Sequence, residues 1–370
     1  MPSVFRFLLA AALVAPWGCS SDDAADAGGT VPSVGGSAGA DAGGGSGAGG
    51  TAGSPNPPPV AERSELPAPP GTGSPAPAGT AGNLKVLDWA GFKAAVSYTF
   101  DDSNSSQIEN YPALQALGVP MTFYLQTGKV TESSNPVWAQ ALLDGHELGN
   151  HTQSHQSSGP NIGADTDAAT AFIEERFNTK VYTMAAPNGS GDYAEVARTR
   201  FLINRGVSDQ QIEANGAADP FNLPCYIPAT ATTETMFDAK IDAVRSAGKW
   251  QVVLVHGFAG GTDQAYQPVA LDDFTNSVVH TKSLGDVWVD SLLEVAAYWR
   301  AQKLLSAVVP TSADGVSTWT WTLPEHFPPH KFVRVSVDGG HLTQAGAALA
   351  WDEHGYYEVA LDLGTLTLAP

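Results

Sequence analysis

Short apolar runs alternate with amphipathic segments between Leu84 and about Gln302. Because the runs are rich in β-branched and aromatic residues, they favour buried strands. The strand-like runs end near Asp102, Leu125, Leu148, Ala186, Val207 and His256. The segments between them have helical periodicity, and the clearest are 137–143, 166–177, 193–201, 232–247 and 286–302. This alternation predicts an α/β fold with a parallel sheet and helices outside it, and it favours closure into a barrel.

The pattern changes after about Leu304, where short runs of alternating polarity are broken by Asp-Gly, Gly-Gly and Pro turn signals. These runs are 304–309, 316–323, 332–337 and 356–363. Several short strands separated by turns are typical of all-β modules. We therefore expect an α/β domain at 83–302 and a small β-sandwich accessory module at 303–370.

Residues 19–82 are mostly Gly, Ala, Ser, Pro and Asp, with almost no large apolar side chains. Such a segment cannot bury enough surface to offset its ordering entropy, so we expect a disordered linker. Residues 1–18 have the pattern of a signal peptide, because Arg6 precedes a short apolar run. Cys19 is then the candidate for lipidation, which predicts an exported lipoprotein at the outer surface or in the periplasm. Ordinary signal cleavage and secretion is the alternative.

The formal net charge is -20, from 18 Lys and Arg against 38 Asp and Glu. This balance argues against nucleic acid or an anionic membrane surface as a partner. Contact with a membrane is expected only through a lipid on Cys19, and a neutral polymer is an easier substrate than an anionic one. The second cysteine, Cys225, lacks a partner and is interpreted as a small core residue. A monomer is expected.

The apolar run Ala94–Phe100 ends in two adjacent carboxylates, Asp101 and Asp102. Side chains alternate along a strand, so the two carboxylates point in different directions if the strand continues to its end. One of them could hold a metal ion while its neighbour takes part in proton transfer. The alternative is that the pair only ends a strand and caps a turn.

Three further positions carry candidate chemistry. His151 and His155 are four residues apart, so on a helical turn both rings reach one ion, although a surface pair is the commoner explanation. His256 ends a strand-like run, where a hydrogen-bonded core histidine is the commoner explanation. Asn188 lies in an Ala-Pro-Asn-Gly turn, whose backbone N–H groups either stabilise an oxyanion or only form the turn.

Together these residues resemble the polysaccharide deacetylase family, which is carbohydrate esterase family 4 or the NodB homology domain. The matching motifs are Thr99–Asp102, His151–His155 and Leu254–His256, in the family's order. The resemblance covers about Ala94 to Gln302. It implies a distorted (β/α) barrel and the metal-dependent removal of acetyl groups from sugars.

The resemblance also implies a metal site with three protein ligands, Asp102, His151 and His155. Such a site leaves one coordination position for water and substrate. Zn2+ is the default ion, and Co2+, Ni2+ or Mn2+ fit the same ligands.

The other implied roles concern proton transfer and charge. Asp101 acts as the general base and His256 as the general acid, and the backbone N–H of Asn188 stabilises the oxyanion. The nearby carboxylates are expected to favour the charged imidazole of His256.

The sequence departs from the family at two motifs. The third motif usually has an arginine two residues before its proline, and here that position is Ala185. The Asp and Trp of the fourth motif are not found. We hypothesise that Arg205 enters from the neighbouring strand and pairs with Asp101 in place of the missing arginine. The alternative is an arginine on an exposed turn.

The leading interpretation is N-deacetylation of an acetylated carbohydrate polymer, such as a chitin-type or cell-wall glycan. An O-acetyl esterase acting on acetylxylan-like polymers would use the same residues, so the motifs do not separate the two. A non-catalytic surface carbohydrate-binding protein is the third alternative, with the module at 303–370 binding the sugar. Trp319 and Trp321, which share one face of an expected strand, are the aromatic candidates in that module.

Overall fold

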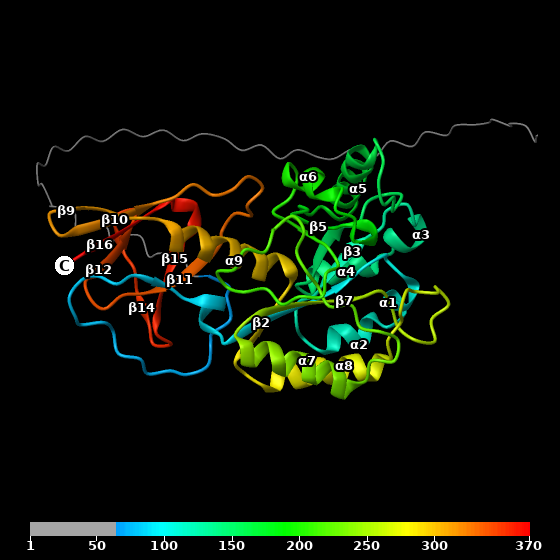
Figure 1. Ribbon diagram of the computed structural model, residues 1–370, viewed down its shortest axis with the longest axis horizontal. Coiled ribbons are helices and arrows are strands. Elements are labelled where there is room, and N and C mark those ends of the chain that lie inside the picture. Colours follow the sequence, from blue (N-terminus) through cyan, green and yellow to red (C-terminus); the bar gives the residue numbers. More distant parts are fainter. Residues whose placement is uncertain (1–63) are drawn as a thin grey trace, which may run out of the picture. The chain divides into compact units, whose positions relative to one another are not determined.

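A computed structural model describes residues 64–370 (Figure 1). The expected signal peptide, Cys19 and the linker up to residue 63 lie outside the described residues, so export and lipidation stay predictions. In residues 64–370, no helix combines the length and the apolar character that crossing a bilayer requires.

The seven parallel strands of the α/β part form one sheet in the order β6-β5-β4-β3-β2-β7, and β8 pairs with the first half of β2. Every residue of these strands is buried except the last residue of β8, and the strands β2, β3 and β7 are accordingly mostly apolar in the sequence. Their bounds are β2 (Ala94–Phe100), β3 (Thr122–Leu125), β4 (Glu147–Asn150), β5 (Thr183–Ala185), β6 (Ile203–Arg205), β7 (Trp250–Val255) and β8 (Val287–Val289).

An irregular segment closes the sheet between its two outer strands, β6 and β7. Leu223 forms a parallel bridge with Arg205 of β6, and Tyr226 forms one with Val253 of β7. The Leu223 N–H donates to the Asn204 carbonyl of β6, and the Tyr226 N–H donates to the Val252 carbonyl of β7. The expected barrel is therefore present in distorted form, with single bridges instead of a strand on one side.

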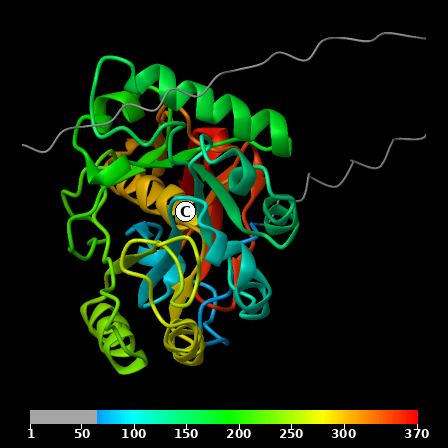
Figure 2. The ribbon, with the colours of Figure 1, turned by 90° about the vertical axis from the view of Figure 1, so that its right-hand side faces the viewer.

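The helices lie around this sheet, with α5 on one side and the α7 and α8 pair on the other (Figures 1 and 2). Their bounds are α1 (Ser105–Glu109), α2 (Tyr111–Ala116), α3 (Val130–Ser133), α4 (Val137–Leu143), α5 (Ile162–Phe177), α6 (Tyr193–Arg198), α7 (Glu234–Ala247), α8 (Leu271–Ser283) and α9 (Leu292–Ala307). The α/β barrel class predicted from the alternation is confirmed.

Two expected elements near the end of the barrel are wrong. The helix expected at 286–302 is preceded by a strand, because Val287–Val289 pair with β2, and the helix α9 starts at Leu292. Trp288 is therefore a buried strand residue, not the start of a helix. The strand expected at 304–309 is largely the last turns of α9, which ends at Ala307. Both errors come from apolar runs too short to separate strand from helix by periodicity.

The C-terminal part consists of two antiparallel sheets, as expected for an all-β module. One sheet has the order β1 (Lys85–Val86), β11 (Phe332–Ser336), β15 (Tyr356–Ala360) and β14 (Trp351–Asp352). The other has the order β13 (Ala347–Ala348), β12 (His341–Gln344), β16 (Thr365–Ala369), β10 (Val316–Thr320) and β9 (Thr311–Ala313). Trp319 and Trp321 are buried in the core, so neither side chain presents its ring to a sugar.

Residues 64–82, which the composition assigns to the linker, contact the C-terminal sheets. The Ser64 N–H donates to Glu358 Oε2 at 2.9 Å, and the Gly79 N–H donates to the Asp338 carbonyl at 2.9 Å. The buried Arg334 of β11 donates to the carbonyls of Leu66 and Pro67. This part of the predicted linker therefore packs on the β-module, while the domain boundaries themselves stay predictions.

Candidate metal centre

Asp101 and Asp102 follow the last residue of β2, where the backbone turns sharply. Asp102 and Ser103 have φ values of 74° and 54°, in the left-handed region that non-glycine residues rarely adopt. This turn, and not the strand alternation that the sequence suggested, sends the two carboxylates to different neighbours. Backbone strain of this kind is typical of functional sites.

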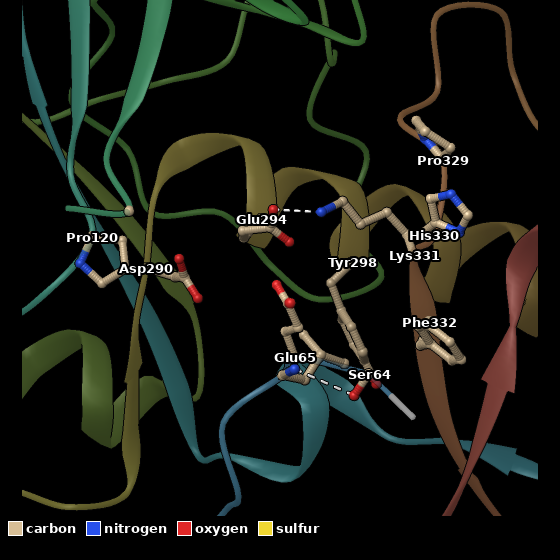
Figure 3. A pocket seen from close by; sticks show the side chains of 12 residues that line it. Ser64, Glu65, Pro120, Asp290, Glu294, Tyr298, Pro329, His330, Lys331 and Phe332 are labelled. Atoms are coloured by element: carbon tan, nitrogen blue, oxygen red, sulfur yellow. Dashed lines mark hydrogen bonds and ion pairs between the residues drawn. The ribbon is translucent and has the colours of Figure 1, made fainter. Parts of the chain in front are cut away.

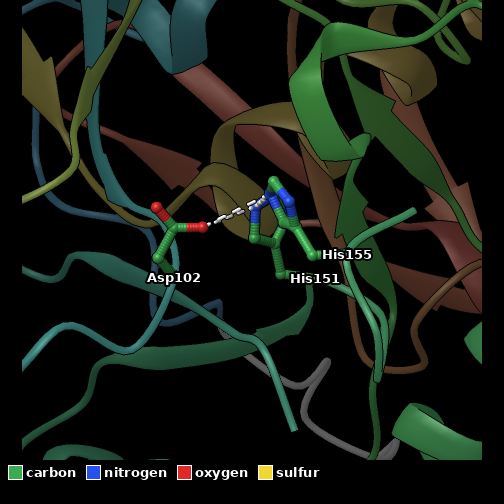
Figure 4. Close-up of side chains that lie close together, drawn as sticks. All are labelled: Asp102, His151 and His155. Carbon is green, nitrogen blue, oxygen red and sulfur yellow. Dashed lines mark hydrogen bonds and ion pairs between the residues drawn. The ribbon is translucent and has the colours of Figure 1, made fainter. Parts of the chain in front are cut away.

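Asp102, His151 and His155 bring three ligand atoms to one point (Figure 4). The Nε2 atoms of the two histidines are 3.1 Å apart, and Asp102 Oδ1 lies 3.3 Å from that of His151 and 3.4 Å from that of His155. Ligand atoms about 2.0–2.1 Å from a tetrahedral ion are about 3.3 Å from one another. The three side chains therefore fit three corners of a tetrahedral metal site.

The two histidines lie on a loop after β4, so the helical turn expected from their spacing is wrong. Thr152 and His155 both have positive φ, 61° and 56°. Asn150 Oδ1 accepts the Thr152 N–H at 2.7 Å, and Thr152 Oγ1 accepts the His155 N–H at 3.0 Å. Asp165, in the first turn of α5, accepts the Ser154 N–H. These local bonds, not a helix, bring the two rings together.

The orientation of His151 is fixed by the strand beside it. Its Nδ1 lies 2.9 Å from the Ala185 carbonyl of β5, and this contact leaves Nε2 facing Asp102. A histidine that donates through one nitrogen to a carbonyl is the usual arrangement of a metal ligand. Burial lowers the pKa of His151, but Asp101 and Asp102 outweigh burial and raise it above its ordinary value. The pKa of Asp102 is held well below its usual range, because its burial is outweighed by the hydrogen bond and charge of His151.

We expect the metal affinity to fall with decreasing pH from a point above 6.5, the ordinary histidine value. A metal binds the neutral imidazole, so protons compete with it, and the raised pKa of His151 makes that competition begin at higher pH. Zinc competition with a chromophoric chelator between about pH 5 and about pH 8 measures the effect. An affinity that stays constant until the pH is well below 6.5 contradicts the prediction.

The guanidinium of Arg205 pairs with the carboxylate of Asp101. Its Nη2 donates to Asp101 Oδ2, and both side chains are almost fully buried. Arg205 and Ala185 are register partners in the β5–β6 pair, so the guanidinium reaches Asp101 from the strand next to the position of the missing arginine. Burial lowers the pKa of Arg205, but the charge of Asp101 outweighs it and raises that pKa. Arg205 is therefore buried and not on an exposed turn.

Cys225 lies on the far side of the same guanidinium. Arg205 Nη1 donates to the Gly206 carbonyl at 2.9 Å and lies 3.8 Å from Cys225 Sγ. Burial raises the pKa of the Cys225 thiol to about 11, so the thiol is neutral and packs in the core, as the sequence suggested.

His256 follows β7, and its backbone is tied to the loop after β2. Its carbonyl accepts hydrogen bonds from Asn104 Nδ2 at 2.7 Å and Gln107 Nε2 at 2.8 Å. Burial lowers the pKa of His256, and the opposite effect of Asp101 and Asp102 does not outweigh it. The carboxylates favour the charged imidazole as expected, but burial has the larger effect and leaves the pKa of His256 below its ordinary value. Among residues 64–370, no hydrogen-bond partner reaches the buried Nδ1 of His256.

Asn188 lies in a short turn after β5 with a left-handed backbone, φ 54°. The next residue, Gly189, also has positive φ, and a Cβ there would come within 2.1 Å of the Val207 side chain. Only glycine fits this position without displacing its neighbour. The turn therefore holds Asn188 at the edge of the site, while the oxyanion role of its N–H stays a prediction.

One cavity of about 450 Å3 collects these residues. Of the predicted site residues it is lined by Asp101, Asp102, His151, His155, Asn188 and His256, with Arg205 buried behind Asp101. The sequence did not predict that four further residues also line this cavity: Val207, Ile227, Leu254 and Tyr266. Three of them are on irregular segments without a motif, so no spacing signal could have placed them there.

A second cavity, of about 760 Å3, lies between the start of the described chain, α9 and β11 (Figure 3). Its wall includes Glu65, Asp290 and Glu294, and the Glu294 carboxylate pairs with Lys331 at 2.5 Å. Burial raises the pKa of Asp290 to about 7. None of the predicted site residues lines this cavity.

A comparison with sequence models of protein families matches residues 91–202 to the polysaccharide deacetylase family. Over residues 91–202 the match confirms the resemblance, and it includes the motifs Thr99–Asp102 and His151–His155 but not Leu254–His256. Among curated proteins, a gellan lyase from Bacillus sp is 27% identical over 135 residues, which are 34% of this chain. The match spans 5% of that protein's length.

Solved structures similar to this chain include a family 4 acetyl xylan esterase from Clostridium thermocellum in complex with a cobalt ion. It is 18% identical, with 54% of this chain and 89% of that chain covered at a TM-score of 0.39. The Xyl-CE4 domain of a xylanase from the hindgut metagenome of Trinervitermes trinervoides is 16% identical. The match covers 54% of this chain and 88% of that chain, with a TM-score of 0.38. A CE4 family pseudoenzyme from Bacillus anthracis is 17% identical. The match covers 55% of this chain and 65% of that chain, with a TM-score of 0.37.

Proposed function

We propose that residues 91–202, which belong to the polysaccharide deacetylase family, are part of a metal-dependent hydrolase that removes acetyl groups from a polysaccharide or oligosaccharide. One observation carries the proposal. The triangle of Asp102, His151 and His155 has the size of a metal site, and it shares its cavity with a carboxylate and an imidazole suited to proton transfer.

Asp102, His151 and His155 are the residues that would hold the ion. When bound, the ion lowers the pKa of a water molecule and polarises the acetyl carbonyl. The ligand set fits Zn2+ best by its size and by its mixture of nitrogen and oxygen, and Co2+, Ni2+ or Mn2+ also suit these ligands.

Asp101 is placed to accept the proton of the attacking water. Its Oδ2 is occupied by Arg205, whereas its Oδ1 is buried and has no hydrogen-bond partner in residues 64–370. The carboxylate is 3.6 Å from His151 Nε2, beside the metal site without belonging to it. Arg205 balances the negative charge of the Asp101 carboxylate, because a buried charge needs a partner of opposite sign.

His256 and Asn188 complete the chemistry at the carbonyl. The His256 imidazole lines the same cavity and would give a proton to the leaving amine, after which the acetate departs. The Asn188 N–H would donate to the carbonyl oxygen as negative charge develops on it. Because burial favours neutral His256, the proton that it donates must be acquired during the reaction, and Asp101, which lines the same cavity and takes the proton of the water, would supply it.

The same residues serve an ester as well as an amide, so the proposal includes both, with N-acetylated amino sugars first. An acetylxylan-type O-acetyl ester is the second candidate. A purely carbohydrate-binding role is less favoured, because Trp319 and Trp321 are buried in the β-module, while Asp101 and Arg205 form a complete buried pair next to the metal ligands.

Acetate release from N-acetylated chito-oligosaccharides, peptidoglycan and acetylxylan tests the proposal. We expect release from at least one of these substrates, its loss after dialysis against a chelator, and its recovery on adding Zn2+ or Co2+. The substrate from which acetate is released shows whether the protein cleaves an amide or an ester. No acetate from any substrate, with or without added ion, would leave the binding role as the better explanation.

A further inference from the structure

Tyr266 is an exposed aromatic side chain at the edge of the catalytic cavity. Its relative exposure is 60%, and it is the only aromatic residue among the exposed large apolar side chains of residues 64–370. It lines the same cavity as Asp101 and His256. Its ring centroid is 5.3 Å from that of His256, with the two planes at 84°. A large aromatic ring exposed to water at the edge of this cavity is available to contact a bound substrate.

The loop that carries Tyr266 is held in place by Asp263. Asp263 Oδ2 accepts the Ser106 N–H at 2.6 Å, and its Oδ1 accepts the Ala265 N–H at 3.3 Å. The Ser106 hydroxyl in turn accepts the Phe258 N–H at 3.1 Å. These bonds attach the loop after β7 to the first turn of α1, which follows the Asp101 turn.

The loop conformation is costly, which indicates that the position of Tyr266 matters. Gln264 and Gln267, on both sides of it, have φ values of 52° and 45° in the left-handed region. Non-glycine residues hold this conformation only where the surroundings compensate for the strain. Gln267 Nε2 also donates to the Tyr266 hydroxyl at 3.0 Å. The ring is therefore held by its own loop and not by burial.

We propose that Tyr266 is a specificity-determining residue that stacks on a pyranose ring of the substrate chain, and that Asp263 positions it. The inference rests on the proposed function and specifies its substrate class as a saccharide with a free ring face next to the acetylated group. The faces of a pyranose ring present C–H groups, which favour the electron-rich face of an aromatic ring. The cavity that would receive the acetyl group is also lined by the apolar side chains of Val207 and Ile227.

Kinetics with two substrates test this role. The probes are N-acetylchitotetraose or acetylated xylotetraose, whichever the wild type deacetylates, and 4-nitrophenyl acetate, which has no sugar ring. In Tyr266→Ala, kcat/KM for the tetrasaccharide falls about tenfold more than kcat/KM for the small ester, mainly through KM. Tyr266→Phe recovers most of the tetrasaccharide activity, because it keeps the ring face. Met236→Ala, an exposed apolar residue of α7, is the matched control and changes neither substrate.

Equal losses for both substrates in Tyr266→Ala overturn the proposal, since they mean that the tyrosine acts on His256 and not on the sugar. An unchanged tetrasaccharide KM overturns it as well. Asp263→Ala is expected to raise the tetrasaccharide KM in the same direction as Tyr266→Ala, with no added loss in the double variant. Independent effects that add in the double variant contradict the positioning role of Asp263.

Calorimetric binding separates this inference from the proposed function. If the wild type releases no acetate, the affinity of N-acetylchitotetraose and xylotetraose for the protein without added metal still reports on Tyr266. A tetrasaccharide that binds about tenfold more weakly to Tyr266→Ala supports the stacking role. Equal affinity for the two proteins, or no binding to the wild type, overturns it.

Discussion

Replacement of His151 by alanine is expected to abolish acetate release and zinc binding together. His151 supplies one of the three ligand atoms, and its ring is fixed by the Ala185 carbonyl, so its loss leaves a site with only two of these ligands. The stabilisation that the ion gives the reacting carbonyl amounts to several kcal/mol, which corresponds to at least about a thousandfold in turnover. Acetate release and the zinc content of the purified variant measure the two effects.

His354→Ala is the matched control for this experiment. His354 also pairs with an aspartate, because its Nδ1 lies 2.6 Å from Asp352 Oδ1, but it belongs to the β-module. We expect unchanged zinc content and turnover in that variant. A His151→Ala protein that retains wild-type turnover at a zinc content near zero would contradict the metal-dependent mechanism.

Arg205→Met is expected to lower both stability and turnover. The substitution leaves the Asp101 carboxylate buried without its cation, and breaking a buried pair in this way costs about 3–5 kcal/mol. The carboxylate that would accept the water proton also loses the contact that holds its Oδ2, so turnover falls as well. Denaturant unfolding and acetate release measure the two effects.

Arg200→Met provides the comparison for an exposed ion pair. Arg200 donates to Asp167 through two nitrogens at 2.6 and 3.1 Å, but this pair is on the surface. Exposed pairs contribute about 0–1 kcal/mol, so this variant changes little in stability and nothing in turnover. An Arg205→Met protein that is destabilised but keeps wild-type turnover means that Arg205 stabilises the fold without supporting Asp101 in the reaction.

Some residues of the site could be predicted from the local sequence, because each of them directly follows a strand that the sequence pattern indicates. The β2 run leads to Asp101 and Asp102, and the β7 run leads to His256, whatever the rest of the chain does. The spacing of His151 and His155 predicts that both rings reach one ion, and they do lie together. The reason differs from the prediction, because hydrogen bonds in a loop, and not a helical face, bring the two rings together.

Arg205 could be suggested from the sequence because strand order places it next to the missing position. Its β6 strand pairs with β5 in a register that sets Arg205 opposite Ala185, and the small Ala185 side chain leaves room for a guanidinium from the neighbouring strand. Tyr266 could not be found in this way. Its place depends on how Asp263 folds a long loop back onto the first turn of α1, a contact between residues far apart in the sequence.

The closing segment between β6 and β7 has a consequence for solubility. Without it, the sheet would end in two edge strands whose unpaired N–H and C=O groups can pair with another chain. Leu223 and Tyr226 cover those edges with single bridges, although the segment has no regular strand of its own. Arg205 lies on one of the covered edges. Loosening this segment therefore exposes a template for aggregation and, at the same step, loosens the strand that holds Arg205 against Asp101.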